Sequence, residues 1–140
     1  MLQLYKGDLL PKDAWNMLKD KEKTILVDVR TQAEWHYVGV PDLSSINKKL
    51  FLIEWRKLPD MAFNEKFEND IRESIKDTNR DIIFICHTGG RSYEAAVATT
   101  KLGYKNCYNL QDGFEGSLDA KGHRANINGW KAENLPWRQY

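Results

Sequence analysis

The chain has 140 residues, with 21 basic and 20 acidic side chains and a formal net charge of +1. This length fits one domain over residues 1–140, and a nearly neutral chain lacks the basic field that favours nucleic acid as a partner. No apolar run approaches the roughly 18 residues that a membrane span needs, and the first residues do not resemble a secretory signal. Two cysteines are too few for a disulfide framework. We therefore expect a single cytoplasmic domain without a membrane or nucleic-acid partner.

Helical patterns recur along the chain. Proline suits a first helical position, which predicts a helix from Pro11. Thr31 and Glu34 have the spacing of a capping box, so a second helix is expected to begin there. Apolar residues at helical spacing predict two more helices, at 64–77 and at 91–102, the latter ending before Gly103.

Strands are predicted where β-branched and apolar residues run together. They lie at 25–29, 51–53, 82–86 and 106–110. Because these strands alternate with helices, the predicted fold class is α/β, with a parallel sheet covered by helices. Glycines and tryptophans follow residue 110, and we expect this tail to be irregular apart from one short helix.

One segment carries recognisable chemistry, the loop from Cys86 to Ser92 between the last buried strand and its helix. Ligand sites in open α/β sheets lie at the carboxyl ends of strands, and a helix start offers free N–H groups and positive potential. Gly89 and Gly90 allow these N–H groups to curl into an anion-binding nest. A cysteine at its base is expected to act as a thiolate, and Arg91 can bind an oxyanion.

Each cysteine also has a purely structural interpretation. Free cysteine is among the most buried residue types, but a purely structural turn needs neither the glycine pair nor the arginine beside Cys86. Cys107 is expected near the amino end of its strand, on the order of 10 Å from Cys86 along the sheet, which is beyond disulfide reach. We therefore interpret Cys107 as a buried structural thiol.

Two motifs together resemble the rhodanese-like domain family over essentially the whole chain. The first is Val27-Asp28-Val29-Arg30, followed by Glu34-Trp35. The second is Cys86-His87-Thr88-Gly89-Gly90-Arg91-Ser92. The resemblance implies a five-stranded parallel sheet with helices on both faces, and it implies single-domain bacterial sulfurtransferases as the type.

The resemblance further implies a thiosulfate sulfurtransferase in which Cys86 carries sulfur as a persulfide. Cys86 and Arg91 would be the catalytic residues, and Arg91 would hold the donor's sulfonate. The substrate-binding residues would be the rest of the loop, namely His87, Thr88, Gly89, Gly90 and Ser92 together with Arg91. The donor would be a small sulfane such as thiosulfate, and the acceptor cyanide, a thiol or a protein. Neither an organic cofactor nor a metal is implied.

Two other functions stay open at this point. One is a persulfide carrier that delivers sulfur to a protein partner and turns over thiosulfate poorly. The other is a phosphatase or arsenate reductase, whose loop has five residues between cysteine and arginine. Four residues separate Cys86 from Arg91 here, and a tighter ring suits a single sulfur atom.

Several residues outside the loop resemble site residues but are assigned to structure. Asp28, Arg30 and Glu34 are expected to form an ion-pair cluster that closes a strand-to-helix turn. His87 supports the thiolate or simply faces solvent, and Arg124 is more typical of a solvated side chain than of an anion contact. Surface positions are predicted for His36 and His123, and packing roles for Trp35, Trp55, Trp130 and Trp137. Closure of the tail over the loop, through Trp130 and Trp137, is a further hypothesis.

Overall fold

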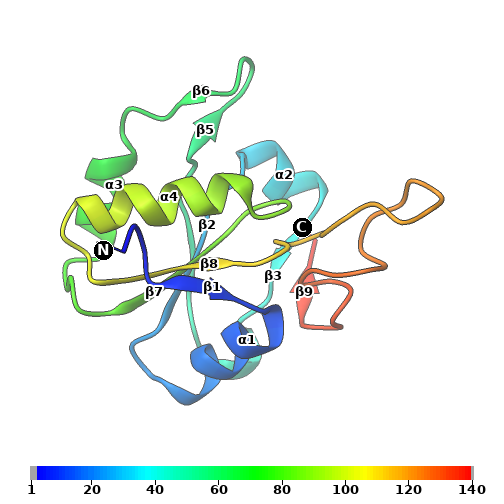
Figure 1. Cartoon of the computed structure of the whole chain (residues 1–140), viewed down its shortest axis with the longest axis horizontal. Coiled ribbons are helices and arrows are strands. Elements are labelled where there is room, and N and C mark those ends of the chain that lie inside the picture. Colours follow the sequence, from blue (N-terminus) through cyan, green and yellow to red (C-terminus); the bar gives the residue numbers. More distant parts are fainter. Residues whose placement is uncertain (1–2, 140) are drawn as a thin grey trace.

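The computed structural model describes residues 3–139, so residues 1, 2 and 140 of the predicted domain lie outside the described part. Within it, five parallel strands form a central sheet in the order β1-β8-β7-β2-β4 (Figure 1). Their bounds are β1 Gly7–Leu9, β2 Ile25–Asp28, β4 Leu50–Leu52, β7 Asp81–Ile85 and β8 Asn106–Leu110. The predicted α/β class and the five-stranded parallel sheet are confirmed.

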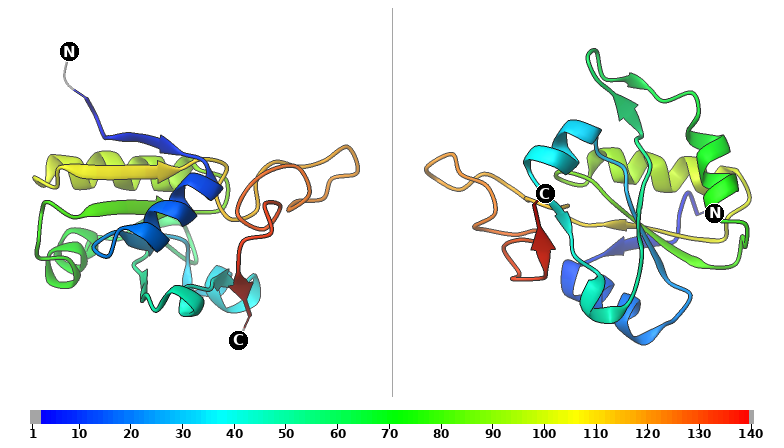
Figure 2. Two further views of the ribbon diagram at one scale, coloured as in Figure 1. Left: turned by 90° about the horizontal axis from the view of Figure 1, so that it is seen from below. Right: turned by 180° about the vertical axis from the view of Figure 1, so that it is seen from behind.

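Helices cover both faces of this sheet (Figures 1 and 2). On one face lie α3 and α4, and on the other α1 and the 3-10 turn η1, while α2 lies beyond the carboxyl end of β2. Their bounds are α1 Pro11–Asp20, α2 Gln32–Tyr37, η1 Ser44–Ile46, α3 Phe67–Ser74 and α4 Gly90–Lys101. No helix described in residues 3–139 has the length and apolar character needed to cross a membrane.

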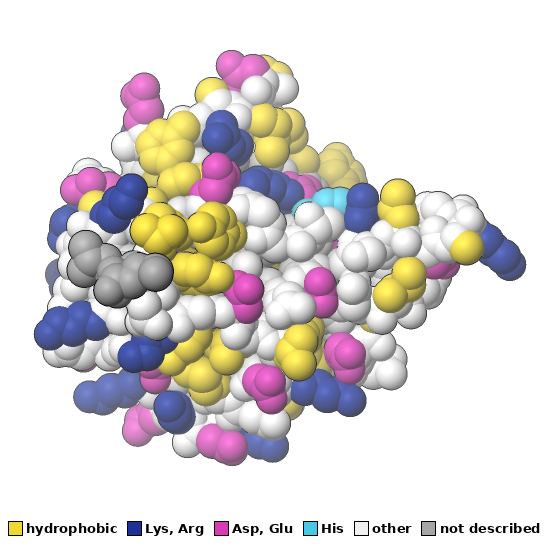
Figure 3. Space-filling model, in the orientation of Figure 1, with side chains coloured by type: hydrophobic (Ala, Val, Ile, Leu, Met, Phe, Trp, Pro, Cys, Tyr) yellow, Lys and Arg dark blue, Asp and Glu magenta, His cyan; other side chains and the backbone are white. Residues whose placement is uncertain are grey.

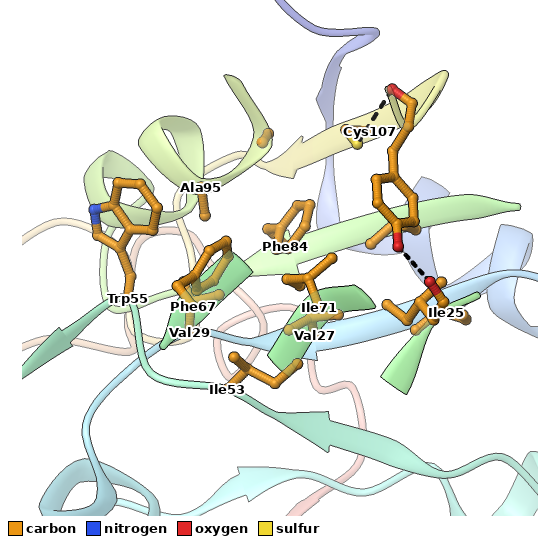
Figure 4. Close-up of a cluster of buried hydrophobic side chains, with 14 of the residues drawn as sticks. Ile25, Val27, Val29, Ile53, Trp55, Phe67, Ile71, Phe84, Ala95 and Cys107 are labelled. Atoms are coloured by element: carbon orange, nitrogen blue, oxygen red, sulfur yellow. Dashed lines mark hydrogen bonds between the residues drawn. The ribbon is translucent and has the colours of Figure 1, made fainter. Parts of the chain in front are cut away.

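The sheet is buried from both sides, which explains why its central strands are continuous apolar runs. Side chains of β2 alternate between two core clusters: Val27 faces α3 and α4, whereas Leu26 faces α1. Figure 4 shows the first cluster, which includes Val27 of β2, Phe84 of β7 and Ala95 of α4. Each fully buried aliphatic or aromatic side chain contributes about 1.5–3 kcal/mol. This packing fixes the carboxyl ends of β2 and β7 beside each other.

Local signals in the sequence set most of the helix ends. Pro11 is the first residue of α1, and Thr31 forms the predicted capping box with Glu34 at the start of α2. Gly103 follows α4 with a φ of +104°, a conformation that glycine adopts at low cost. The predicted helix at 64–77 is shorter, Phe67–Ser74, because the Asn64 side chain accepts the Lys66 N–H before the first turn.

The tail is irregular, as predicted, but the expected short helix does not form in residues 111–139. In residues 111–139 the structure has turns and one short strand, β9 Trp137–Arg138, instead of a helix. β9 pairs antiparallel with β3 Val40–Pro41, and a hairpin of β5 Arg56–Lys57 and β6 Ala62–Phe63 precedes α3.

Acidic and basic side chains are interspersed on the face shown in Figure 3.

Candidate active site

Cys86 follows the last residue of β7 and lies at the base of the loop that leads into α4. Its side chain is 1% exposed, and its Sγ accepts the Gly89 backbone N–H at 3.1 Å. The Ser92 Oγ lies 3.2 Å from the same sulfur. Gly89, with a φ of +110°, is the N-cap of the 12-residue helix α4. The sulfur therefore sits against an N–H donor at the positive end of a helix dipole, where negative charge is stabilised.

The turn that follows β8 holds this loop in place. The Phe114 N–H donates to the Cys86 carbonyl oxygen at 2.8 Å, and the Glu115 N–H donates to that of His87 at 3.1 Å. A Cβ on Gly113 would stand 2.5 Å from the His87 carbonyl oxygen and 2.6 Å from that of Cys86. Glycine at position 113 is therefore required for the turn to approach the loop.

Arg91 does not point freely at an anion site, because its guanidinium is bound by Glu34 of α2. Two hydrogen bonds of 2.7 and 2.9 Å join Nη1 and Nη2 to the two carboxylate oxygens. Burial alone would raise the pKa of Glu34, but hydrogen bonds from Arg91 and Thr31 and the Arg91 charge lower it to about 2. Hydrogen bonding to Glu34 raises the pKa of Arg91. No local pattern indicates this pairing, because the partners are 57 residues apart.

The cluster of Asp28 and Arg30 is structural, as predicted. Arg30 is fully buried and donates to both carboxylate oxygens of Asp28, at 2.6 Å from Nη2, and to the Gly39 carbonyl oxygen at 2.7 Å. Its guanidinium lies 4.3 Å from the centre of the Phe114 ring. The pair thus links the end of β2 to the turn behind the loop. The prediction that Glu34 belongs to the same cluster is wrong, because Glu34 binds Arg91 and Thr31 instead.

The other predicted loop residues lie around the rim. Thr88 and Gly90 are exposed, and His87 is half-buried, with Nε2 3.9 Å from a carboxylate oxygen of Glu115. Burial first, and then the charge of Arg124, lower the pKa of His87 below its usual 6.5. The imidazole is therefore neutral at neutral pH and supplies no fixed charge to Cys86. Arg124 itself donates to the Gly116 carbonyl oxygen at 2.6 Å.

Ser92 connects the sulfur to two residues that sequence analysis missed. Its Oγ lies 2.6 Å from the Oδ1 of Asn109 in β8, and the Asn109 Nδ2 donates to the Oδ1 of Asp8 at 3.1 Å. Asn109 and Asp8 are cross-strand partners in the register of β8 and β1. Their types and positions carry no motif, and only the pairing of the edge strand brings them to the site.

Cys107 lies where it was predicted. It pairs with Ile82 near the amino end of β7, is fully buried, and forms no disulfide with Cys86. Burial raises the pKa of its thiol to about 11. This thiol is therefore protonated at neutral pH and is not a second nucleophile.

The tryptophans divide between the core and the surface. Trp35, Trp55 and Trp130 are buried, as predicted, whereas Trp137 is 41% exposed and packs on Lys131 and Phe114. Trp130 belongs to the cluster on the α1 face, and its backbone N–H donates to the Gly113 carbonyl oxygen. The tail thus supports the loop through the turn that carries Gly113. His36 and His123 are at the surface, as predicted.

A parallel α/β sheet with a cysteine beneath a helix N-terminus is an architecture suited to a nucleophilic thiol that handles anionic groups. The Rhodanese-like domain family matches residues 10–120. An uncharacterised protein of Rickettsia rickettsii is 44% identical over 126 residues, which cover 89% of this chain and 91% of that protein. The chain therefore belongs to the Rhodanese-like domain family.

Two further relatives bear on structure and activity. The crystal structure of Rv0390 from M. tuberculosis superposes with a TM-score of 0.88 at 45% identity, covering 97% of this chain and 99% of that one. A protein of Allochromatium vinosum, described as a sulfurtransferase, is 31% identical over 97 residues, or 69% of this chain and 74% of that protein. The family and the Allochromatium relative support a place among the sulfurtransferases.

Proposed function

We propose that this protein is a sulfurtransferase that carries sulfane sulfur as a persulfide on Cys86. The single observation that carries the proposal is the Cys86 Sγ held at 3.1 Å by the Gly89 N–H at the start of α4. Such a site stabilises negative charge both on a thiolate nucleophile and on the outer sulfur of a persulfide. The sulfurtransferase description of the Allochromatium relative supports the same assignment. Two unpaired cysteines fit a reducing compartment, and we place the reaction in the cytoplasm.

The reaction consists of two displacements at sulfur. The Cys86 thiolate attacks the outer sulfur of thiosulfate, a new S–S bond forms, and the bond to the sulfonate sulfur breaks, so that sulfite leaves with the electron pair. The acceptor, which is cyanide, a thiol or a protein cysteine, then attacks the outer sulfur of the persulfide. Cys86 leaves as the thiolate. The N–H groups from His87 to Arg91 surround the transferred sulfur.

In this proposal Arg91 binds the anionic sulfonate of the donor, but the pairing of Arg91 with Glu34 limits how it can do so. Glu34 already takes two of its N–H donors, so a donor sulfonate binds by the remaining donors or by displacing Glu34. Thr88 and Gly90, at the exposed rim, are the remaining proposed substrate contacts.

Intact mass measurement tests the proposal directly. The reduced protein is incubated with thiosulfate, with Cys86→Ser and Cys107→Ser as matched variants. We expect a gain of one sulfur, about 32 Da, that cyanide removes, that Cys107→Ser retains and that Cys86→Ser lacks. An unmodified wild-type mass with thiosulfate and with other sulfane donors would refute the proposal. Turnover of an aryl phosphate or arsenate would then support the alternative chemistry.

A further inference from the structure

A continuous chain of hydrogen bonds leads from the candidate nucleophile to the surface at the edge strand. It runs from the Cys86 Sγ to the Ser92 Oγ (3.2 Å), the Asn109 Oδ1 (2.6 Å) and, through the Asn109 Nδ2, the Asp8 Oδ1 (3.1 Å). Tyr5 donates its hydroxyl to the same Asp8 oxygen at 2.8 Å. Helix α4 contributes Ser92, and the adjacent strands β8 and β1 contribute Asn109 and Asp8 (Figure 1).

The direction of each hydrogen bond follows from the outer end of the chain. A carboxylate only accepts hydrogen bonds, so Asn109 must turn its NH₂ toward Asp8. Burial and the hydrogen bond to Asp8 raise the pKa of Tyr5 to about 12, so its hydroxyl keeps its proton and donates as well. The orientation of the Asn109 amide is thereby fixed, with its carbonyl oxygen directed at Ser92.

This orientation determines what Ser92 offers to the sulfur. A hydroxyl has one proton, and the Asn109 Oδ1 has none, so the 2.6 Å contact uses the Ser92 proton. Ser92 therefore presents a lone pair to the Cys86 Sγ, which suits a thiol S–H and opposes a thiolate. Ser92 and Cys86 are both at least 99% buried, so water does not readily replace either partner.

We propose that Asp8 and Asn109 are positioning residues that make the Ser92 hydroxyl a hydrogen-bond acceptor toward Cys86. Because an acceptor suits an S–H group, they favour the thiol over the thiolate when Cys86 carries no transferred sulfur. The inference rests on the proposed function, in which Cys86 is the nucleophile. In the persulfide, the Sγ is a neutral divalent sulfur and the negative charge lies on the outer sulfur. The chain therefore opposes the free thiolate without opposing the persulfide, and it favours retention of bound sulfur.

The following charged groups around the loop are the same in every variant. Arg91 of α4 interacts electrostatically with Cys86, Glu34 and Asp28. His87 of the loop faces Glu115, Arg124, Glu34 and Arg91, and Arg30 pairs with Asp28 at the end of β2. Cys107 adds no signal near neutral pH, because burial raises the pKa of its thiol to about 11. A change in the thiolate signal can therefore be assigned to Cys86.

The experiment follows the ultraviolet absorbance of the thiolate against pH, with the Cys86→Ser signal subtracted. Asn109→Leu removes the acceptor while keeping the shape of the side chain, so the Ser92 proton is free to donate to the sulfur. A hydrogen bond donated to a charged group is stronger than one between neutral groups, so we expect the thiolate fraction at pH 7 to rise about tenfold. Asp8→Ala, a change at an exposed site, is expected to raise it at least about twofold.

Two matched variants separate this chain from other effects. Asp112→Asn removes one negative charge near the loop. Asp112 has a φ of +69°, a conformation that asparagine tolerates. We expect this variant to change the thiolate fraction less than Asp8→Ala does. In a Ser92→Ala background, Asn109→Leu and Asp8→Ala should have no effect. An unchanged thiolate fraction in the single variants overturns the inference. So does a rise in Asp8→Ala no larger than that of Asp112→Asn, or a rise that survives in Ser92→Ala.

The result is independent of sulfur transfer, because the thiolate titrates without any donor. Failure of persulfide formation with the expected thiolate changes would refute the proposed function alone. Persulfide formation without those changes would refute the inference alone. If Asn109→Leu does not fold, Asp8→Ala and its two controls still decide the question.

Discussion

Replacing Glu34 by glutamine separates the charge of its pair with Arg91 from the shape of the side chain. Glu34 and Arg91 are 24% and 17% exposed and are joined by two short hydrogen bonds. The fall in the pKa of Glu34 from 4.5 to about 2 corresponds to about 3 kcal/mol. Solvent screening of a partly exposed pair reduces this, and glutamine keeps one acceptor. We expect Glu34→Gln to lose about 1.5 kcal/mol at pH 7.

The pH dependence of that loss has a definite sign. The pKa of Glu34 is lower in the folded protein than in the unfolded chain, so the ionised carboxylate stabilises the fold. This contribution is complete above about pH 5 and disappears as the pH falls from about 4.5 to about 2. The difference in the free energy of unfolding between wild type and Glu34→Gln should therefore be constant from pH 7 to about pH 5 and shrink below it.

Urea unfolding at a series of pH values measures this difference, and a thermal scan gives a second reading. For a domain of this length, about 1.5 kcal/mol corresponds to a fall in Tm of about 5 °C. Glu68→Gln is the matched control, because Glu68 forms an exposed pair with Arg72 on α3 and should cost less than about 0.5 kcal/mol. An equal loss in both variants, or a Glu34→Gln loss that persists at pH 2.5, would refute the reasoning.

Three further predictions concern the loop and its supports. Gly113→Ala places a Cβ 2.5 Å from the His87 carbonyl oxygen, so we expect it to cost at least about 2 kcal/mol in urea unfolding; Gly103→Ala, with nothing within 4 Å, should cost clearly less. Glu34→Gln should lower the KM for thiosulfate about threefold or more, because Arg91 is released; an unchanged KM would argue against Arg91 as the clamp. Burial lowers the pKa of His87, so the NMR titration of its imidazole should have a midpoint below 6.5. Above pH 7, kcat should therefore show no dependence on the protonation of His87. A midpoint above 7 would contradict this prediction.

The parts of the fold that could be predicted from the sequence are those whose causes are local. The residues from Ile82 to Ile85 are buried on both sides of the sheet, so an unbroken apolar run marks their strand. Thr31 and Glu34 cap a helix within one turn. The loop from Cys86 to Ser92 was identified because its residue types and spacing carry the chemistry in one short segment.

The missed elements depend on contacts between distant parts of the chain. Strand β1 has three residues, one of them apolar, and it exists because it pairs with β8. Strands β3 and β9 have two residues each and stabilise one another, although they are almost a hundred residues apart in the sequence. No residue pattern announces such strands, since their hydrogen bonds come from a partner that only the tertiary fold supplies.

The same distinction applies to the chemistry of the site. The loop motif supplies the sulfur, the N–H donors and the arginine, but residues outside it restrain two of its side chains. Glu34 holds Arg91 from α2, and Asn109 with Asp8 holds Ser92 from the edge of the sheet. Under the proposed function, the first restraint changes the binding of the donor's sulfonate by Arg91, and the second changes the stability of negative charge on the Cys86 sulfur. Two proteins with the same seven-residue loop can therefore differ in donor affinity and in thiolate content when the residues at these outer positions differ.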